Sequence, residues 1–192
     1  MSPAFPCALC GRPVRRAPST RTRPAAIVCR HCRYRMYDYP RPAAGVLVLR
    51  GGDVLLLRRA HPPRVGALDL PGGFMEGGEG IEAAARRELR EETGLVLGRL
   101  APLGCYRDVY HLRGFGRFPT LNFYFAGRWR RGEPVAADDA ASAEWVPLAG
   151  VLRRRRGFAW RHMAVALRDL GRWARGARGA GATGWGPAGR MR

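Results

Sequence analysis

Three glutamates stand at the spacing of successive helical turns. Glu88, Glu91 and Glu92 occupy positions i, i+3 and i+4, so a helix would project all three from one face. Carboxylates held side by side repel one another unless a cation lies among them, and oxygen-rich clusters suit Mg²⁺ or Mn²⁺. The pattern therefore predicts a divalent-metal site that could neutralise an anionic substrate and activate water.

The neighbouring residues extend this interpretation but also allow a simpler one. A Pro-Gly-Gly segment at 71–73 precedes the helix and predicts a tight turn whose backbone can approach a ligand, because glycine has no Cβ. A glycine turn, a helix N-terminus and a cation together would suit a diphosphate. The alternative is a solvated acidic face, balanced by Arg86, Arg87 and Arg90.

Four of the five cysteines form two Cys-x-x-Cys pairs. Eighteen residues separate the pair Cys7 and Cys10 from the pair Cys29 and Cys32, which is the spacing of a zinc ribbon. Four thiolates fill a tetrahedral site, so we expect structural Zn²⁺ and no catalysis there; disulfides or free thiols are the alternative. Residues 1–40 are too few to fold without such a cross-link.

The hydrophobic pattern outlines the elements that must position these residues. Apolar runs at 46–49 and 54–57 predict a β-hairpin covered on both faces. A helix is expected over 80–93, with Gly94 as its C-terminal cap. Further strands are expected at 103–110, 120–126 and 143–146, and strands around a central helix indicate an α/β sandwich.

These elements divide the chain into four parts. Residues 1–40 form the four-cysteine zinc ribbon, a stiff proline hinge covers 37–42, and the main domain spans 43–150. An amphipathic C-terminal helix is expected within 151–174, on the pattern of Phe158, Met163, Ala166, Leu167 and Leu170. The Arg- and Gly-rich tail at 175–192 has little to bury and is predicted to be disordered.

The main domain resembles the Nudix hydrolases. The match is the Nudix box, with its nine fixed or apolar positions and their spacing met by Gly73, Glu79, Arg87, Glu88, Leu89, Glu91, Glu92, Gly94 and Leu95. The resemblance implies a mixed-sheet α/β/α sandwich and metal-dependent hydrolysis of a nucleoside diphosphate linked to another moiety, releasing a nucleoside monophosphate.

The resemblance also implies roles for single residues. Glu88, Glu91 and Glu92 would bind Mg²⁺ or Mn²⁺ together with the Gly73 carbonyl. Glu79 would assist metal binding or helix placement, and Arg87 would orient the glutamates. The general base stays open among Glu91, Glu92 and an acid of the Asp138-Asp139 pair.

A zinc ribbon before a Nudix domain resembles two branches, the NADH pyrophosphatases and a group that acts on ADP-ribose, FAD or related nucleotides. The downstream signature of the NADH branch is missing, which disfavours NADH and leaves the linked moiety open. Candidate substrate-binding residues are Tyr106, Tyr110, Asp139 and Glu144; the tyrosines could stack on a base or belong to the core.

The formal charge of +19 admits a second class of function. The chain contains no lysine and many scattered arginines, a pattern that a GC-rich genome would produce, so we attribute the charge mainly to composition, with steering of anionic substrates as a by-product. The alternative is a nucleic-acid-binding or RNA-cap-processing protein that uses the ribbon, the arginines at 153–156 and the tail. The intact box favours the enzyme.

The sequence also bears on location and assembly. The chain lacks eighteen consecutive apolar residues and begins without a secretory signal pattern, so we expect a cytoplasmic enzyme with no membrane segment. The oligomeric state stays open, a homodimer included.

Overall fold

A computed structural model describes residues 5–14, 16–17, 26–37, 39–112, 116–154 and 156–176. The chain divides into two compact units, Met1–Pro40 and Arg41–Arg192. Beyond Gly176, the predicted disordered tail lies outside the described residues.

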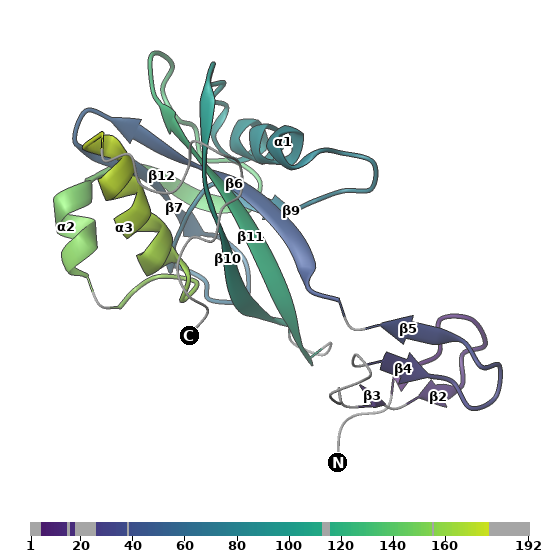
Figure 1. Cartoon of the computed structure of the whole chain (residues 1–192). Coiled ribbons are helices and arrows are strands. Elements are labelled where there is room, and N and C mark those ends of the chain that lie inside the picture. The colour runs from purple at the N-terminus through teal and green to yellow at the C-terminus, as the bar shows by residue number, and fades with distance from the viewer. Residues whose placement is uncertain are drawn as a thin grey trace. The chain divides into compact units, whose positions relative to one another are not determined.

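The N-terminal unit consists of short strands joined by turns (Figure 1). Strands β1 (Phe5–Pro6) and β2 (Pro13–Val14) pair antiparallel. Strands β3 (Arg16–Ala17), β4 (Ala26–Val28) and β5 (Arg35–Tyr37) form a three-stranded antiparallel sheet with β5 at one edge. Among the described residues of the N-terminal unit, only Cys7, Val14 and Cys29 are buried, so the unit needs a cross-link to be stable.

The second unit is built on a mixed seven-stranded sheet. Its main strands are β6 (Arg41–Arg50), β7 (Asp53–Arg59), β10 (Leu100–Leu112), β11 (Gly116–Arg128) and β12 (Ala140–Pro147). Their order is β10-β11-β6-β7-β12, with β11 and β6 parallel and the other neighbours antiparallel. Two short strands, β8 (Leu68–Asp69) and β9 (Gly72–Phe74), pair with β7 and β6.

Three helices cover the two faces of this sheet (Figure 1). Helix α1 (Ile81–Thr93) packs on one face, and α2 (Leu148–Arg153) and α3 (Met163–Ala174) pack on the other. The predicted hairpin accounts for helices on both faces, because successive side chains of β6 enter different hydrophobic clusters. Leu47 and Leu49 pack in the cluster that contains α3, and Val46 and Val48 pack in the cluster that contains α1. The expected mixed-sheet α/β/α sandwich is confirmed.

The structure corrects three details of the predicted elements. The expected helix within 151–174 is two helices, because the chain leaves α2 at an arginine run, turns at Gly157 (φ 96°) and bridges from Phe158 to Leu68 before α3 begins. The Pro-Gly-Gly segment is not an isolated turn, since Gly72 and Gly73 pair with β6 as a strand. Strand β6 begins at Arg41, two residues before the predicted domain start.

Among the residues that the structure describes, no helix is long and apolar enough to cross a membrane.

Candidate active site

Helix α1 carries the glutamates and is firmly placed by its opposite face. Ala84, Ala85 and Leu89 are buried against the sheet, and Gly94 ends the helix in the left-handed conformation, at φ 69°. Glu92 is also buried, with 7% of its surface exposed, and its carboxylate accepts a hydrogen bond from the Gly72 backbone N–H at 2.8 Å. Burial raises the pKa of Glu92 to about 8.

Gly73 lies directly against the carboxylate of Glu88. A Cβ at position 73 would stand 2.5–2.7 Å from the three atoms of that carboxylate, closer than such atoms can approach. The absence of a side chain therefore lets Glu88 reach over the β9 backbone. Burial raises the pKa of Glu88, although the adjacent Arg87 opposes this shift.

Arg87 connects the acidic residues of the box. Its guanidinium donates to Glu79 at 2.7 Å, to Glu88 at 2.8 Å and to Glu91 at 3.0 Å. It also donates to the Phe74 carbonyl at 3.1 Å, which ties the middle of α1 to β9. Hydrogen bonding to Arg87 lowers the pKa of Glu79.

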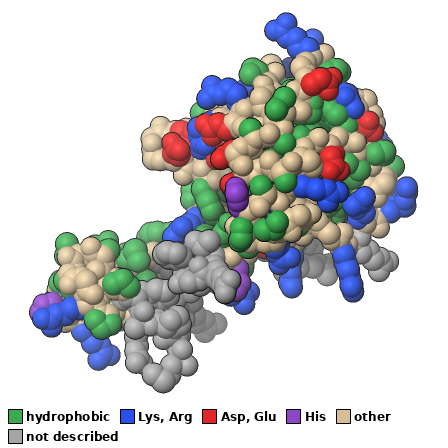
Figure 2. Space-filling view, turned by 180° about the vertical axis from the view of Figure 1, so that it is seen from behind, with side chains coloured by type: hydrophobic (Ala, Val, Ile, Leu, Met, Phe, Trp, Pro, Cys, Tyr) green, Lys and Arg blue, Asp and Glu red, His purple; other side chains and the backbone are tan. Residues whose placement is uncertain are grey.

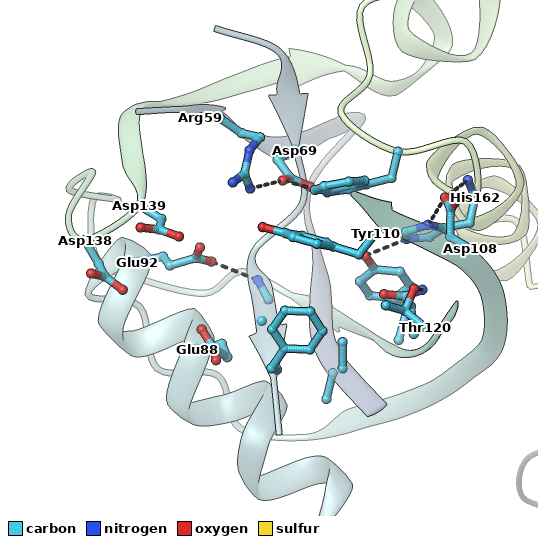
Figure 3. Close-up of a pocket in the computed structure, with 18 residues that line it drawn as sticks. Arg59, Asp69, Glu88, Glu92, Asp108, Tyr110, Thr120, Asp138, Asp139 and His162 are labelled. Atoms are coloured by element: carbon cyan, nitrogen blue, oxygen red, sulfur yellow. Dashed lines mark hydrogen bonds and ion pairs between the residues drawn. The ribbon is translucent and has the colours of Figure 1, made fainter. Parts of the chain in front are cut away.

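A cavity of about 230 Å³ opens beside α1, and one end of it is acidic. Glu88, Glu92, Asp138 and Asp139 lie together there (Figure 3). The loop with the two aspartates is fixed by backbone bonds from Ala137 N–H to the Glu92 carbonyl at 3.1 Å and from Ala60 N–H to the Asp139 carbonyl at 2.8 Å. Glu91 does not line the cavity; its side chain is 41% exposed and turns to Arg87.

This acidic end fits a divalent cation. Burial is the main cause of the raised pKa of Glu88 and of Glu92; the negative charge of Asp138 raises the pKa of Glu88 further, and that of Asp139 raises the pKa of Glu92. Clustered carboxylate oxygens are the donors that Mg²⁺ and Mn²⁺ prefer. Glu88 and Glu92 line the cavity and could hold such an ion, with Asp138 and Asp139 in the same lining.

Another part of the cavity lining holds a cation beside an aromatic ring. Arg59 donates to Asp69 at 2.9 Å and to the Pro63 carbonyl at 2.8 Å, and its guanidinium lies 5.4 Å from the Trp160 ring centroid. Trp160 donates to Asp69 at 3.0 Å and stacks on Tyr110, with centroids 4.9 Å apart. Among the described residues that line the cavity, Arg59 is the one arginine (Figure 3).

A buried polar chain forms a third part of the lining. His162 Nδ1 lies 2.7 Å from Asp108, and His162 Nε2 lies 3.0 Å from the Tyr124 hydroxyl. The His162 backbone N–H also donates to Asp108, at 3.1 Å. Burial by itself would raise the pKa of Asp108, but the hydrogen bonds from His162 and the Val109 N–H lower it to about 2.

The predicted substrate-binding residues divide into two groups. Tyr110 and Asp139 line the cavity. Tyr106 is instead a core residue, whose hydroxyl donates to buried Asp169 at 2.8 Å. Glu144 lies outside the cavity lining and pairs at 2.9 Å with Arg58 of the neighbouring strand β7.

Sequence reasoning missed Arg59, Asp69, Asp108, Trp160 and His162. They come from β7, β8, β10 and the segment before α3, and no fixed spacing relates them. Only the fold brings them to one cavity (Figure 3).

The four paired cysteines form a separate cluster in the N-terminal unit. Their ligand atoms all lie within 4.8 Å of one another, and the Cys7–Cys32 and Cys10–Cys29 sulfur pairs are each 3.6 Å apart. A tetrahedral Zn²⁺ with Zn–S bonds of about 2.3 Å requires sulfur separations of about 3.8 Å, so the cluster fits that ion. Backbone N–H groups, that of Cys32 foremost, lower the pKa of Cys29 to about 6, which favours the thiolate form.

The fold and the box define the class of protein. A family model of the NUDIX domain matches residues 39–167, more than half of the chain, and the chain belongs to the Nudix family as one of its hydrolases. The mixed sheet and helices are shared with a Nudix hydrolase from Nitrosomonas europaea, at TM-score 0.61 and 22% identity over 88% of this chain and 92% of the other. A MutT Nudix hydrolase from Burkholderia pseudomallei matches at TM-score 0.59 and 25% identity, over 69% and 98% of the two chains.

Two relatives with named activities are more similar in sequence. The chain is 33% identical over 148 residues to an ADP-ribose pyrophosphatase from Methanocaldococcus jannaschii, covering 75% of this chain and 80% of that protein. It is 35% identical over 145 residues to the NAD-capped RNA hydrolase NudC of Pseudomonas fluorescens, covering 72% of this chain and 46% of that protein. The chain thus spans less than half the length of the second relative.

Proposed function

We propose that this Nudix hydrolase cleaves the diphosphate bond of ADP-ribose or a closely related nucleoside diphosphate derivative, with Mg²⁺ or Mn²⁺, and releases a nucleoside monophosphate. The observation that carries the proposal is the convergence of Glu88 and Glu92 on a cavity that also contains Arg59. Similarity to the ADP-ribose pyrophosphatase over four fifths of that relative supports the choice of substrate.

The charges of the cavity suit an anionic substrate once a cation is bound. A divalent cation held by Glu88 and Glu92 would neutralise the diphosphate and lower the pKa of the attacking water. Arg59 lines the same cavity and, although it pairs with Asp69, would offer its guanidinium N–H groups to a phosphate oxygen. Arg87 holds Glu88, and the Gly72 N–H holds Glu92, so both carboxylates are oriented before the substrate binds.

The position of each acid narrows the choice of general base. Asp138, Asp139 and Glu92 line the cavity, whereas Glu91 turns away to Arg87. A base must lie within hydrogen-bond reach of the water it activates. We therefore place the general base among the three acids of the cavity and not at Glu91.

The N-terminal unit completes the proposal as a structural module. We propose that Cys7, Cys10, Cys29 and Cys32 hold Zn²⁺, because their separation matches a closed tetrahedral site. Such a site has no open position for a substrate. Four clustered thiols stay reduced in the cytoplasm, where we place the enzyme.

A second candidate substrate is NAD-capped RNA. The identity to NudC, 35% over 72% of this chain, favours its inclusion, although the chain covers only 46% of that relative. Both candidates contain a diphosphate that joins two nucleoside moieties or a nucleoside and a ribose, so the same cavity chemistry would serve either.

The test is a substrate panel with Mg²⁺, assayed for the nucleoside monophosphate product. ADP-ribose, FAD, NADH and NAD-capped RNA form the panel. Glu88→Gln and Glu92→Gln each remove a charged ligand and should lower kcat/KM by at least about 100-fold. Glu82→Gln is the matched control, because Glu82 lies on the same helix, is 51% exposed and pairs only with Arg86 among described residues.

Either of two results would contradict the proposal. One is an absence of turnover across the whole panel with Mg²⁺ or Mn²⁺. The other is an equal loss of activity in Glu82→Gln and Glu92→Gln, because the effect would then come from helix charge and not from the cavity.

A further inference from the structure

The N-terminal unit is far more basic, for its length, than the second unit, residues 41–192, which is the catalytic unit. Residues 1–40 contain eight arginines and one acidic residue, Asp38, whereas residues 41–192 contain twenty-six arginines and fourteen acidic residues. Zn²⁺ with four thiolates contributes a net charge of about −2, which leaves the unit clearly cationic. Compositional bias that replaces lysine by arginine does not change charge, so it does not explain the scarcity of acids.

Exposed aromatic side chains alternate with these arginines. Within the run Arg33-Tyr34-Arg35-Met36-Tyr37, every residue is exposed, and Tyr34 and Tyr37 are 38% and 37% accessible. Tyr39 is 69% accessible, and its ring lies 5.7 Å from that of Tyr37. Tyr34 lines a small pocket together with the core residues Cys7 and Cys29, whereas the exposed rings of Tyr37 and Tyr39 lie outside that core.

Part of this run lies at the edge of the three-stranded sheet. Strand β5 is the last strand of its sheet and pairs only with β4 among the described strands. Arg30 and His31 are exposed in the neighbouring cysteine knuckle. Figure 2 shows Arg and His side chains beside hydrophobic ones on this unit, and its described residues include no Asp or Glu.

We propose that this surface, the ribbon platform (Arg30, Arg33, Arg35, Tyr37 and Tyr39), binds single-stranded nucleic acid without sequence preference. Arginines neutralise phosphates, and tyrosine rings stack on bases that a single strand leaves free. An acidic peptide would use the arginines but would leave the tyrosines without flat partners. A duplex keeps its bases paired and would contact only the arginines.

The proposal goes beyond hydrolysis and does not depend on it. If the substrate is an RNA that carries a diphosphate at its end, the platform would bind the RNA body and raise the effective concentration of that end near the catalytic unit. If the substrate is free ADP-ribose, the platform would instead give the enzyme a separate attachment to nucleic acid.

The test measures the anisotropy of a fluorescein-labelled twelve-nucleotide single-stranded RNA with the full-length, zinc-loaded protein. We expect affinity to fall with salt, at a slope of about −0.7 in log K per phosphate contact. Arg30→Gln/Arg35→Gln should weaken binding at least about fivefold and flatten the slope by about 1.4. Tyr37→Leu should weaken binding about fivefold or more and leave the slope unchanged.

The matched control is Arg130→Gln/Arg131→Gln, which removes the same charge from an exposed loop of the catalytic unit. It should bind RNA like the wild type. Zinc content and ADP-ribose hydrolysis should be unchanged in every variant, so failure of the platform and failure of the proposed enzyme activity are distinguishable.

Three outcomes would overturn the proposal. The first is equal RNA affinity for the platform and control variants. The second is equally tight binding of a duplex of the same length, and the third is displacement of the RNA by polyglutamate at equal charge concentration, which would indicate an acidic protein partner.

Discussion

The contact between Gly73 and Glu88 shows how one residue without a side chain sets the position of a charged group. The Glu88 carboxylate lies against the β9 backbone, in space that a Cβ at position 73 would need. Arg87 holds the same carboxylate from its other side, at 2.8 Å. These two contacts hold the carboxylate where it lines the cavity.

Gly73→Ala should therefore lower activity more than stability. The added methyl group would displace the flexible end of Glu88, so we expect a fall in kcat/KM of about 100-fold, as for a misplacement of roughly 1 Å. The melting temperature should change by no more than about 3 °C, because only a side-chain end moves. Steady-state kinetics and thermal unfolding measure the two effects.

Gly77→Ala serves as the comparison for this change. A Cβ at position 77 would meet nothing within 4 Å, so activity and melting temperature should match the wild type. Full activity in Gly73→Ala would show that the position of Glu88 is not required.

At the scale of elements, the segment before α3 is joined to β10 through Asp108 and His162. Two hydrogen bonds, from the His162 ring and backbone, converge on Asp108. The same segment carries Trp160, whose ring forms a wall of the cavity. The link between the two elements thus also fixes part of the site.

Asp108→Asn should destabilise the catalytic unit in a pH-dependent way. The folded pKa of about 2 lies below the ordinary aspartate value of 3.8, so the carboxylate contributes stability above about pH 4 and loses it as the pH falls toward 2. The shift corresponds to about 2 kcal/mol at pH 7. Guanidinium unfolding followed by tryptophan fluorescence tests this, because all five tryptophans lie in residues 41–192.

The control variant for this prediction is Glu133→Gln, in an exposed loop, which should change stability little at any pH. A destabilisation by Asp108→Asn that is equal at pH 7 and pH 2.5 would argue against the stabilising ionic contact.

The sequence predicts those elements whose signal is local. Helix α1 ends at Thr93 with Gly94 as its cap, as expected, because its apolar spacing and its terminal glycine lie within one segment. The strands of the hairpin also follow, since alternate side chains enter two cores. The Phe158 pattern misled because an apolar residue beside a helix can equally bridge to a strand, as Phe158 does with Leu68.

The remaining half of the cavity could not be predicted because periodicity does not distinguish core from cavity along one strand. Tyr106, Asp108 and Tyr110 share one face of β10. Tyr106 meets Asp169 under α3, whereas Tyr110 reaches the cavity and stacks on Trp160. Whether a side chain of β10 lies in the core or in the cavity depends on how far α3 extends over that strand. That extent is set by contacts between residues distant in the sequence.

At the scale of the whole molecule, the two units rest on different sources of stability. Residues 41–192 bury two extensive hydrophobic clusters around one sheet. The described part of the N-terminal unit buries only Cys7, Val14 and Cys29, so we expect its fold to depend on the Zn²⁺ that we propose the cysteines bind. Loss of that ion should therefore affect one unit and spare the other.

Cys29→Ser tests this division, because Cys29 is buried in the cluster and contributes one of its four sulfurs. We expect zinc to fall from one ion per chain to less than about 0.1, and RNA binding to fall with it. Tryptophan fluorescence, which reports only on residues 41–192, should show an unfolding midpoint within about 2 °C of the wild type, and ADP-ribose hydrolysis should persist. If the midpoint of residues 41–192 also fell, the zinc site would be stabilising the catalytic unit. Changes in two units that share no contacts are expected to act on stability independently.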